Sequence, residues 1–327
     1  MAIGISSTGA FLPDRVVTNH ELENVVDTSD AWIVSRTGIR ERRRADEDAS
    51  SSDLGAAAAQ RALQTAGLGP EQVDGLIVAT SSPDYIQPST ACALQTKIGL
   101  GTVPAFDVSA VCTGFVYALV TGAGLMHTFP QYERLLVVGC EVYSKILNYQ
   151  DRTSCVFFGD GAGAVLLEKV PDGFGVLGAH LMADGSQLDV VGIRAGGSVE
   201  PTSASTLADR RHHFHMDGPR VWEFATHALP SVIKEALTSA DLGVQDIDLL
   251  ITHQANARMI EAIGASLGVP EQRVPLTVDR YGNTAAASVP ITLDEVAAAG
   301  RVRRGDIVVL ASVGGGMTAG AVVLRWY

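Results

Sequence analysis

Two stretches of the sequence, SDLGAAAAQRALQTAGLG (residues 52–69) and VWEFATHALPSVIKEALTSADLG (residues 221–243), decide how this chain folds. Apolar residues recur in both at the spacing of an amphipathic helix. Each is followed by an apolar run of strand length, LIVAT (76–80) after the first and LLIT (249–252) after the second. Helices that alternate with strands buried on both faces are typical of a layered α/β protein.

The two stretches are also similar to each other, which indicates an internal repeat. Ala62-Leu63 aligns with Ala236-Leu237 at an offset of 174 residues. The further matches keep the same order: Val73-Asp74 with Ile247-Asp248, Leu135–Gly139 with Ile307–Ala311, and Ala162–Val165 with Ala319–Val322. The chain is therefore predicted to be two copies of one α/β unit, residues 1–170 and 171–327, with an irregular excursion at about 185–215.

The composition excludes several classes of protein. The chain has 327 residues with 36 Asp and Glu against 24 Lys and Arg, a net charge of −12, so it is not expected to bind nucleic acid. No apolar run is expected to reach the roughly 18–20 residues of a membrane span, and the N-terminus lacks the pattern of a signal peptide. Four cysteines without a C-x-x-C motif do not make a disulfide framework, which predicts a cytoplasmic protein.

Four other motifs have a simple interpretation. GDGAGAVLLE (159–168) and GGGMTAGAVVLRW (314–326) run into strands rather than helices, so their glycines are expected to allow close backbone approach rather than to bind a nucleotide. HHFH (212–215) lacks a second pair of ligands, and no metal site is expected. RTGIRERRR (36–44) is a dense basic run that is usually a solvated surface but would suit phosphates.

Three residues could carry chemistry. Cys112 follows a predicted strand (104–109) and precedes a predicted helix, a position that would stabilise a thiolate through the helix dipole. His253 lies at the end of the predicted strand 249–252, where sites form in α/β sheets. In the repeat, Asn283-Thr284 aligns with Val111-Cys112, so two strand-to-helix elbows should face each other. Core packing of the cysteine and a structural role for the histidine remain open from the pattern alone.

The segments around Cys112, His253 and Asn283 resemble those of the thiolase-fold condensing enzymes, specifically the β-ketoacyl-acyl carrier protein synthase III family. The resemblance covers essentially the whole chain in seven ordered segments: DAWIVSRTGIRERR (30–43), FDVSAVCTGFVYAL (106–119), GDGAGAVLLE (159–168), MDGPRVWEFA (216–225), HQANARMI (253–260), GNTAAASVP (282–290) and GGGMTAG (314–320). It implies a five-layer αβαβα fold built from two duplicated halves, a homodimer, and no cofactor apart from the coenzyme A thioester used as substrate.

The resemblance also implies the reaction. An acyl-CoA would acylate Cys112, and malonyl-acyl carrier protein would lose CO₂ and attack the acyl group to give a 3-oxoacyl-carrier protein. His253 and Asn283 would polarise the malonyl thioester, and the N–H groups of Cys112 and Gly316 would form the oxyanion hole. Arg258 would contact the carrier protein. The residues that match the family's coenzyme A contacts are Thr28, Trp32, Arg36, Arg152 and Asn256, with Trp32 and Arg152 on either side of the adenine.

Departures from the family pattern concern the acyl pocket. Met317 replaces an aromatic residue, Ala319 replaces a tryptophan, and Gln87 stands where a phenylalanine of the partner subunit often closes the pocket. Phe158 and Leu147 are further candidates for the pocket lining. These changes leave the catalytic set intact, and a primer larger or more polar than acetyl is the resulting hypothesis.

Each alternative function would require a different residue at one position of the site. A condensing enzyme or acyltransferase of specialised metabolism, polyketide or quinolone-like, is the alternative, although a simple acyltransferase would want Asp or Glu in place of Asn283. A non-catalytic subunit would lack Cys112. A hydroxymethylglutaryl-CoA synthase would need a catalytic Glu, and a degradative thiolase would need a second cysteine, whereas the chain has none after Cys155.

Overall fold

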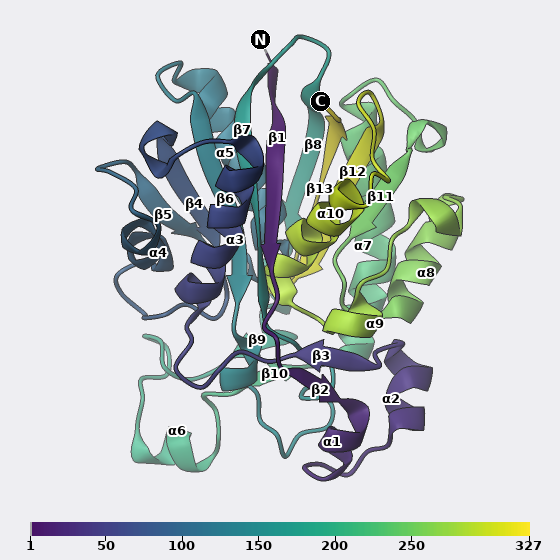
Figure 1. Cartoon of the computed structure of the whole chain (residues 1–327). Helices are drawn as coiled ribbons and strands as arrows, with labels where there is room; N and C mark the ends of the chain where they lie inside the picture. The colour runs from purple at the N-terminus through teal and green to yellow at the C-terminus, as the bar shows by residue number, and fades with distance from the viewer. Residues whose placement is uncertain (1) are drawn as a thin grey trace.

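The apolar runs of the sequence form strands of two sheets in the computed structural model, which describes residues 2–327 (Figure 1). The strands of the first sheet, in the order β1-β7-β6-β4-β5, are β1 (Ala2–Phe11), β7 (Gly161–Val170), β6 (Arg134–Glu141), β4 (Gly75–Ala79) and β5 (Ala105–Val108). The strands of the second, in the order β8-β13-β12-β11, are β8 (Gly175–Ala183), β13 (Thr318–Arg325), β12 (Ile307–Gly314) and β11 (Leu249–Thr252). The strands predicted from apolar runs are thereby confirmed.

The two sheets repeat one topology. In the first, β1 pairs antiparallel with β7, β7 antiparallel with β6, and β6 parallel with β4. In the second, β8, β13, β12 and β11 follow with the same directions. The first sheet has one strand more, β5, which pairs parallel with β4. This symmetry confirms the predicted duplication of the fold, while a division into domains at residue 170 stays a prediction.

Six longer helices make three further layers, so that the fold has the predicted five (Figure 1). α3 (Ser51–Ala66) and α4 (Thr90–Ile98) cover the outer face of the first sheet, and α7 (Gly218–Thr238) and α8 (Ala257–Leu267) cover that of the second. α5 (Gly114–Thr128) and α10 (Ser288–Ala298) lie between the sheets. α3 starts where the Ser50 N–H donates to Asp53 at 2.9 Å, and it ends at Gly67, whose φ is +69°.

Alternate residues of each strand enter different cores because successive side chains point to opposite faces. Leu76 and Val78 of β4 pack in the outer cluster with α3. Ile77 and Ala79 pack in the central cluster, which also contains Phe115 of α5. Burial on both faces explains why these strands are apolar at every position.

The central helix corrects one prediction. Val111–Thr128 contains 18 residues with a mean hydropathy of 1.3, so an apolar run of membrane-spanning length is present after all, and it is the one such helix within residues 2–327. Half of this stretch is buried in the protein, where α5 packs against both sheets. Its hydropathy is therefore that of a core helix between two apolar layers.

The two glycine-rich motifs form strands β7 and β13, as predicted. A Cβ at Gly163 in β7 would lie 2.7 Å from the Ile291 nitrogen of α10, and one at Gly139 in β6 would lie 2.6 Å from the Ala286 carbonyl oxygen. Glycine is needed at both positions because the backbone of the second half passes directly over them.

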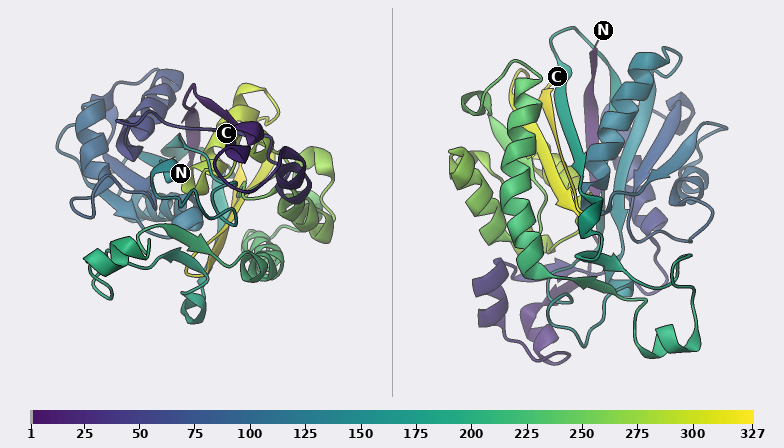
Figure 2. Two further views of the ribbon diagram at one scale, coloured as in Figure 1. Left: turned by 90° about the horizontal axis from the view of Figure 1, so that it is seen from below. Right: turned by 180° about the vertical axis from the view of Figure 1, so that it is seen from behind.

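The smaller elements gather at the end of the molecule where the parallel strands have their carboxyl ends, as the two views in Figure 2 show. They are β2 (Val16–Thr18), α1 (Asn19–Glu23), α2 (Asp30–Thr37), β3 (Glu41–Arg43), β9 (Val191–Ile193), α6 (Ala204–Ala208), β10 (Phe214–Met216) and α9 (Val278–Tyr281). The excursion expected at 185–215 thus contains short elements of its own, including the β9-β10 ribbon.

Candidate active site

Cys112 lies on a tight elbow between β5 and α5. The elbow is the 3-10 turn η2 (Val111–Thr113), and Val111 adopts a left-handed φ of +47°, which is strained for a β-branched residue. Ser312 Oγ of β12 donates to the Cys112 carbonyl oxygen at 2.7 Å. A Cβ at Gly314 would lie 2.8 Å from the Cys112 nitrogen, so the backbone of the second sheet packs against the turn. These contacts hold the thiol in one place.

A second elbow faces the first, but in a register that differs from the prediction. The 3-10 turn η7 (Ala285–Ala287) also begins with a left-handed residue, Ala285 at φ +44°, and it leads into α10 as η2 leads into α5. The two turns are in contact. Cys112 is therefore equivalent to Ala286, and the alignment of Val111-Cys112 with Asn283-Thr284 was wrong by two residues because the preceding loops differ in length.

The thiol of Cys112 is buried, and this changes its expected ionisation. Burial raises the pKa of Cys112 above its ordinary value, and the carboxyl of Glu141 raises it further. A helix dipole contributes up to about 2 kcal/mol in favourable geometries, whereas burial can shift a pKa by about 3–5 units at about 1.4 kcal/mol each. Burial therefore favours the neutral thiol and opposes the effect of the helix dipole that the sequence suggested.

His253 follows β11 directly and is held by two hydrogen bonds. Its N–H donates to the Ala311 carbonyl oxygen at 2.8 Å, and its Nδ1 lies 2.7 Å from Ser288 Oγ at the start of α10. The backbone N–H of Gln254 also donates to Ser288 Oγ, at 3.3 Å. Burial lowers the pKa of His253 to about 3, so the imidazole is neutral over the physiological range.

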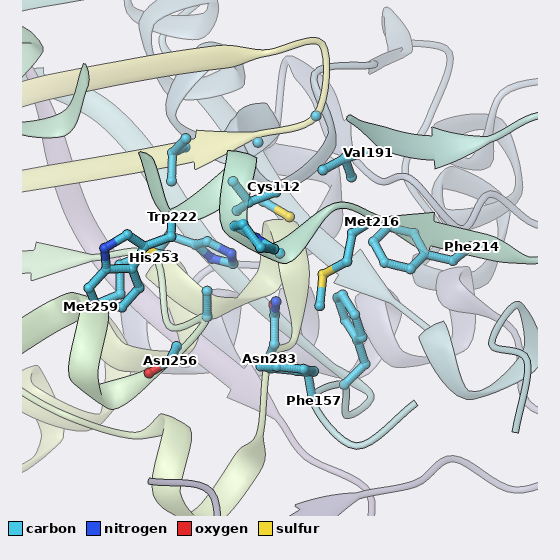
Figure 3. Close-up of a pocket in the computed structure, with 18 of the residues that line it drawn as sticks. Cys112, Phe157, Val191, Phe214, Met216, Trp222, His253, Asn256, Met259 and Asn283 are labelled. Carbon is cyan, nitrogen blue, oxygen red and sulfur yellow. The ribbon is translucent and has the colours of Figure 1, made fainter. Parts of the chain in front are cut away.

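The side-chain amide of Asn283 is oriented by its own elbow. Asn283 Oδ1 accepts the N–H of Ala285 at 2.8 Å, and the Asn283 backbone N–H donates to Phe157 at 2.8 Å. Because the oxygen is occupied, the amide nitrogen is the atom left to face the cavity, and Figure 3 shows it there.

Glu141 is a buried carboxyl that the sequence analysis did not single out. It follows the apolar run of β6 and accepts hydrogen bonds from the N–H groups of Ser81 and Ser82 at 3.0 and 2.9 Å and from Ala286 at 3.4 Å. Burial raises its pKa to about 7, against the lowering effect of these bonds. Glu141 thus joins the end of the first sheet to the second elbow. Its position at the end of a buried strand is a signal that sequence analysis could have used.

A cavity of about 540 Å³ connects these side chains with solvent (Figure 3). Cys112, His253 and Asn283 all line it, so the structure brings the three predicted residues together. The remaining lining is mostly apolar: Phe157, Phe158, Val191, Phe214, Met216, Val221, Trp222, Met259 and Val313. Such a mixture of apolar walls and a few convergent polar groups is typical of a ligand site.

Two residues predicted to belong to the oxyanion hole or the acyl pocket, Gly316 and Leu147, do not line the cavity. Gly314 and Gly315 line the cavity, whereas Gly316 does not, and the predicted role of Gly316 in the oxyanion hole stays a prediction. Met317 lines the cavity as predicted. Gln87 is exposed and does not line the cavity of its own chain, and its role from a partner subunit stays a prediction. Leu147 is buried without reaching the cavity.

Three of the five predicted coenzyme A residues reach the cavity, whereas Thr28 and Arg152 are not part of its lining. Trp32 and Arg36 line it, and the Arg152 guanidinium lies 5.5 Å from the centroid of the Trp32 ring. An adenine between them would need about 7 Å, twice the contact distance of about 3.5 Å, so Arg152 must move outward. Its bond to the Asp27 carbonyl oxygen, at 3.1 Å and exposed, is a weak restraint. Thr28 Oγ1 is buried without a hydrogen-bond partner among the described residues.

Asn256 is the N-cap of α8, and Arg258 lies in the first turn of that helix. Asn256 lines the cavity, and its side chain accepts the N–H of Arg258 at 2.8 Å and donates to the Arg36 carbonyl oxygen at 3.2 Å. It therefore fixes α8 to α2. Arg258 is exposed and forms an ion pair with Glu261 at 3.1 Å, which leaves it accessible to an acidic partner.

Sequence reasoning missed the residues that the β9-β10 ribbon supplies to the cavity. Val191, Phe214 and Met216 come from the excursion, far in sequence from the catalytic elbows. The alternation Phe214-His215-Met216 is a weak strand signal that could have pointed to them. Ser288, which contacts His253, gave no signal, because it is the last of several small residues that lead into α10.

The duplicated αβαβα fold, with a cysteine on its central elbow, defines the class of thiolase-fold enzymes. Within that class, two family models match the chain, one described as 3-oxoacyl-[acyl-carrier-protein (ACP)] synthase III over residues 106–185 and one as the C-terminal part of that enzyme over residues 237–326. The chain belongs to the β-ketoacyl-acyl carrier protein synthase III family, as its sequence suggested.

Individual relatives agree with this assignment. The β-ketoacyl-[acyl-carrier-protein] synthase III of Desulfitobacterium hafniense (strain Y51) is 45% identical over 326 residues, which cover 100% of this chain and 98% of that protein. The crystal structure of 3-oxoacyl-[acyl-carrier-protein] synthase III from Aquifex aeolicus VF5 is 38% identical, with a TM-score of 0.92 over 99% of this chain and 100% of that one. The priming β-ketosynthase of the R1128 polyketide pathway is 31% identical, with a TM-score of 0.91 over 99% and 96%.

Proposed function

We propose that this protein condenses an acyl-CoA primer with malonyl-acyl carrier protein, releasing CO₂ and giving a 3-oxoacyl-carrier protein. The observation that supports this most directly is the meeting of Cys112, His253 and the amide nitrogen of Asn283 in one cavity. No step needs a metal or a bound cofactor, since the coenzyme A thioester is itself the substrate.

The first half-reaction is acyl transfer to Cys112. The Cys112 sulfur attacks the thioester carbonyl, the carbon–sulfur bond to coenzyme A breaks, and the thiol proton leaves with coenzyme A as its free thiol. We propose that the N–H groups of Cys112 and of Gly315, which lines the cavity where Gly316 does not, bind the carbonyl oxygen while it is negative. Trp32, Arg36 and Arg152 at the cavity mouth would hold the nucleotide end.

The second half-reaction needs hydrogen-bond donors for a malonyl oxygen that becomes negative as CO₂ leaves. Ser288 Oγ accepts the Gln254 N–H, and within residues 2–327 its own proton has no acceptor other than Nδ1 of His253, so the hydroxyl is proposed to donate to Nδ1. The imidazole proton is then on Nε2. Together with the amide nitrogen of Asn283 it provides two neutral donors that gain strength as charge develops. The resulting carbanion attacks the acyl carbonyl, and the sulfur of Cys112 leaves and regains a proton.

The experiment that tests this function is a reconstituted reaction. The purified protein is incubated with acetyl-CoA and malonyl-acyl carrier protein, and the carrier protein is weighed by mass spectrometry. A mass corresponding to the 3-oxoacyl product supports the proposal. Acyl transfer to the carrier protein without loss of CO₂ would instead indicate a simple acyltransferase.

We predict that decarboxylation does not titrate with an ordinary histidine. Since burial lowers the pKa of His253 to about 3, the imidazole keeps one proton at all pH values above about 5. The rate of CO₂ release from malonyl-acyl carrier protein by the Cys112→Ala variant should therefore stay level between pH 5.5 and pH 8. A loss of activity centred near pH 6.5 would show that His253 is charged in the complex and contradict the donor role.

The aromatic residues behind Cys112 support an apolar primer, and they argue against the polar one considered above. The rings of Phe158 and Tyr143 stack with centroids 4.5 Å apart, and Phe214 lies edge-on to both at 4.8 and 5.4 Å. A polar acyl group against the rings of Phe158 and Phe214 and against Met317, which line the cavity, would lose hydrogen bonds to water without replacing them.

Shortening Phe158 is expected to admit longer acyl groups. The Phe158→Ala variant removes a ring from the cavity wall, so the yield of decanoyl-Cys112 relative to acetyl-Cys112 should rise about tenfold or more in intact-protein mass spectrometry. Trp222→Ala, at the exposed mouth, is the control and should leave the ratio unchanged. An equal ratio in wild type and Phe158→Ala would place the acyl chain elsewhere.

The partners and setting follow from the same family. We propose a homodimer, supported by the unpaired edge strand β5 and by Tyr85 and Ile86, which are 62% and 85% exposed. Sedimentation should then give about twice 34.3 kDa, and a particle of 34.3 kDa would contradict it. Arg258 is proposed to meet the acidic carrier protein. The four free cysteines support a cytoplasmic setting.

A further inference from the structure

A second cavity lies behind the wall of the first and contains the basic run noted in the sequence. It has a volume of about 450 Å³ and lies between α1, the β2-β3 ribbon and the segment 144–158. Phe158 lines both cavities and thus separates them. Nothing in the proposed condensation uses this space.

Four arginines line this second cavity, and their charge is not balanced by ion pairs. They are Arg15, Arg42, Arg43 and Arg44. Within residues 2–327 none of the four forms an ion pair with an acidic side chain. The one acidic residue of the lining, Glu21, is engaged by the Thr18 N–H at 3.0 Å. In an acidic protein this leaves a local excess of positive charge.

The most buried of the four is incompletely bonded. Arg42 is 3% exposed, and its guanidinium donates only to neutral acceptors: the carbonyl oxygens of Val17 and Val156 at 3.2 and 2.7 Å, and Asn19 Oδ1 at 2.8 Å. Its Nε–H has no partner among the described residues. Glu21 and Glu41 act on the Arg42 charge only from beyond ion-pair distance. A buried charge with no direct counter-ion is unfavourable, and an anion in the cavity would offset that cost. Burial also lowers the pKa of Arg42 to about 10.

Much of the rest of the lining is apolar, and this part determines which kind of molecule can carry the anion. Val17 and Leu22 are buried beside Phe158, and Val25 is 55% exposed at the rim. The Arg44 guanidinium lies over the Tyr149 ring, 5.5 Å from its centroid. A free inorganic ion would leave these apolar surfaces against water, whereas a hydrocarbon segment would cover them.

We propose that this second cavity binds an anionic amphiphile, whose carboxylate or phosphate meets the arginines and whose hydrocarbon part lies against Leu22, Val25 and Phe158. The cavity of about 450 Å³ is within the range of small-molecule sites. Planar guanidinium groups suit both head groups, because each presents oxygens that accept paired N–H donors.

Calorimetric titration of the full-length protein tests the site with four probes: decanoate, decyl phosphate, inorganic phosphate and decanol. The two amphiphiles should bind saturably, with the preferred head group showing which source of anion the site takes. Inorganic phosphate and decanol should each bind at least about tenfold more weakly than the better amphiphile. Equal binding of inorganic phosphate or of decanol would overturn the amphiphile assignment.

Variants separate the two cavities. Arg15→Gln combined with Arg44→Gln should weaken amphiphile binding by about tenfold or more. The control is Arg301→Gln combined with Arg303→Gln, which removes the same charge from the loop before β12, outside the second cavity. It should not weaken amphiphile binding. Met216→Trp fills the first cavity only and should leave binding intact. Loss of binding in Met216→Trp but not in Arg15→Gln/Arg44→Gln would assign the ligand to the acyl cavity and overturn the proposal.

Discussion

Replacing Cys112 with alanine is expected to abolish the covalent adduct that acetyl-CoA forms with the protein. The condensation rate should fall on the order of 10³-fold or more, because the reaction loses its covalent intermediate and not merely one hydrogen bond. The substitution removes one buried sulfur and leaves the bond from Ser312 to the Cys112 carbonyl oxygen in place, so the elbow should keep its shape. Intact-protein mass spectrometry after incubation with acetyl-CoA measures the adduct directly.

The control for this variant is a second buried thiol. Cys155→Ala removes a sulfur of similar burial from outside the first cavity. This variant should be acetylated by acetyl-CoA to the same extent as the wild type. An adduct that persists in Cys112→Ala, or that disappears in Cys155→Ala, would show that the nucleophile has been assigned to the wrong cysteine.

The strands were predictable because of where they lie. β4, β6, β11 and β12 sit between helix layers on both faces, and a strand that meets apolar neighbours on both sides needs apolar residues at every position. The resulting continuous runs were visible in the sequence, as was the repeat. The register of the elbows was not, because it depends on the lengths of the loops before Val111 and Ala285.

The sequence predicted those site residues that stand next to a recognisable strand or turn, but not the contacts between residues far apart in the chain. Cys112, His253 and Asn283 each follow a strand or a turn that the sequence marks. The bond between His253 and Ser288 joins residues 35 positions apart, and the packing of Gly315 rather than Gly316 along the cavity depends on how the β12-β13 turn is built. The burial that favours the neutral thiol of Cys112 was not predictable for a related reason: the helix dipole is a local property, whereas burial results from the packing of both halves.

Changing Asn283 to aspartate should separate the two half-reactions. The aspartate keeps an oxygen for the Ala285 N–H, so the elbow should survive, but it replaces two N–H donors with an anion beside the developing enolate. Loss of one preorganised donor costs about 10²–10³-fold in rate, and repulsion between the two negative charges adds to this loss. We therefore expect CO₂ release and condensation to fall by at least about 10³-fold, while acetylation of Cys112 stays within about threefold of wild type.

Two measurements on matched variants decide this prediction. Asn283→Ala removes the donors without adding charge, so it should lose less decarboxylation activity than Asn283→Asp, and the difference reports the effect of the anion on the enolate. The acetyl adduct, weighed in the same samples, shows whether the elbow is intact. If Asn283→Asp decarboxylates malonyl-acyl carrier protein as fast as Asn283→Ala, no enolate develops next to this side chain, and the acceptor of the acyl group must be activated by another residue.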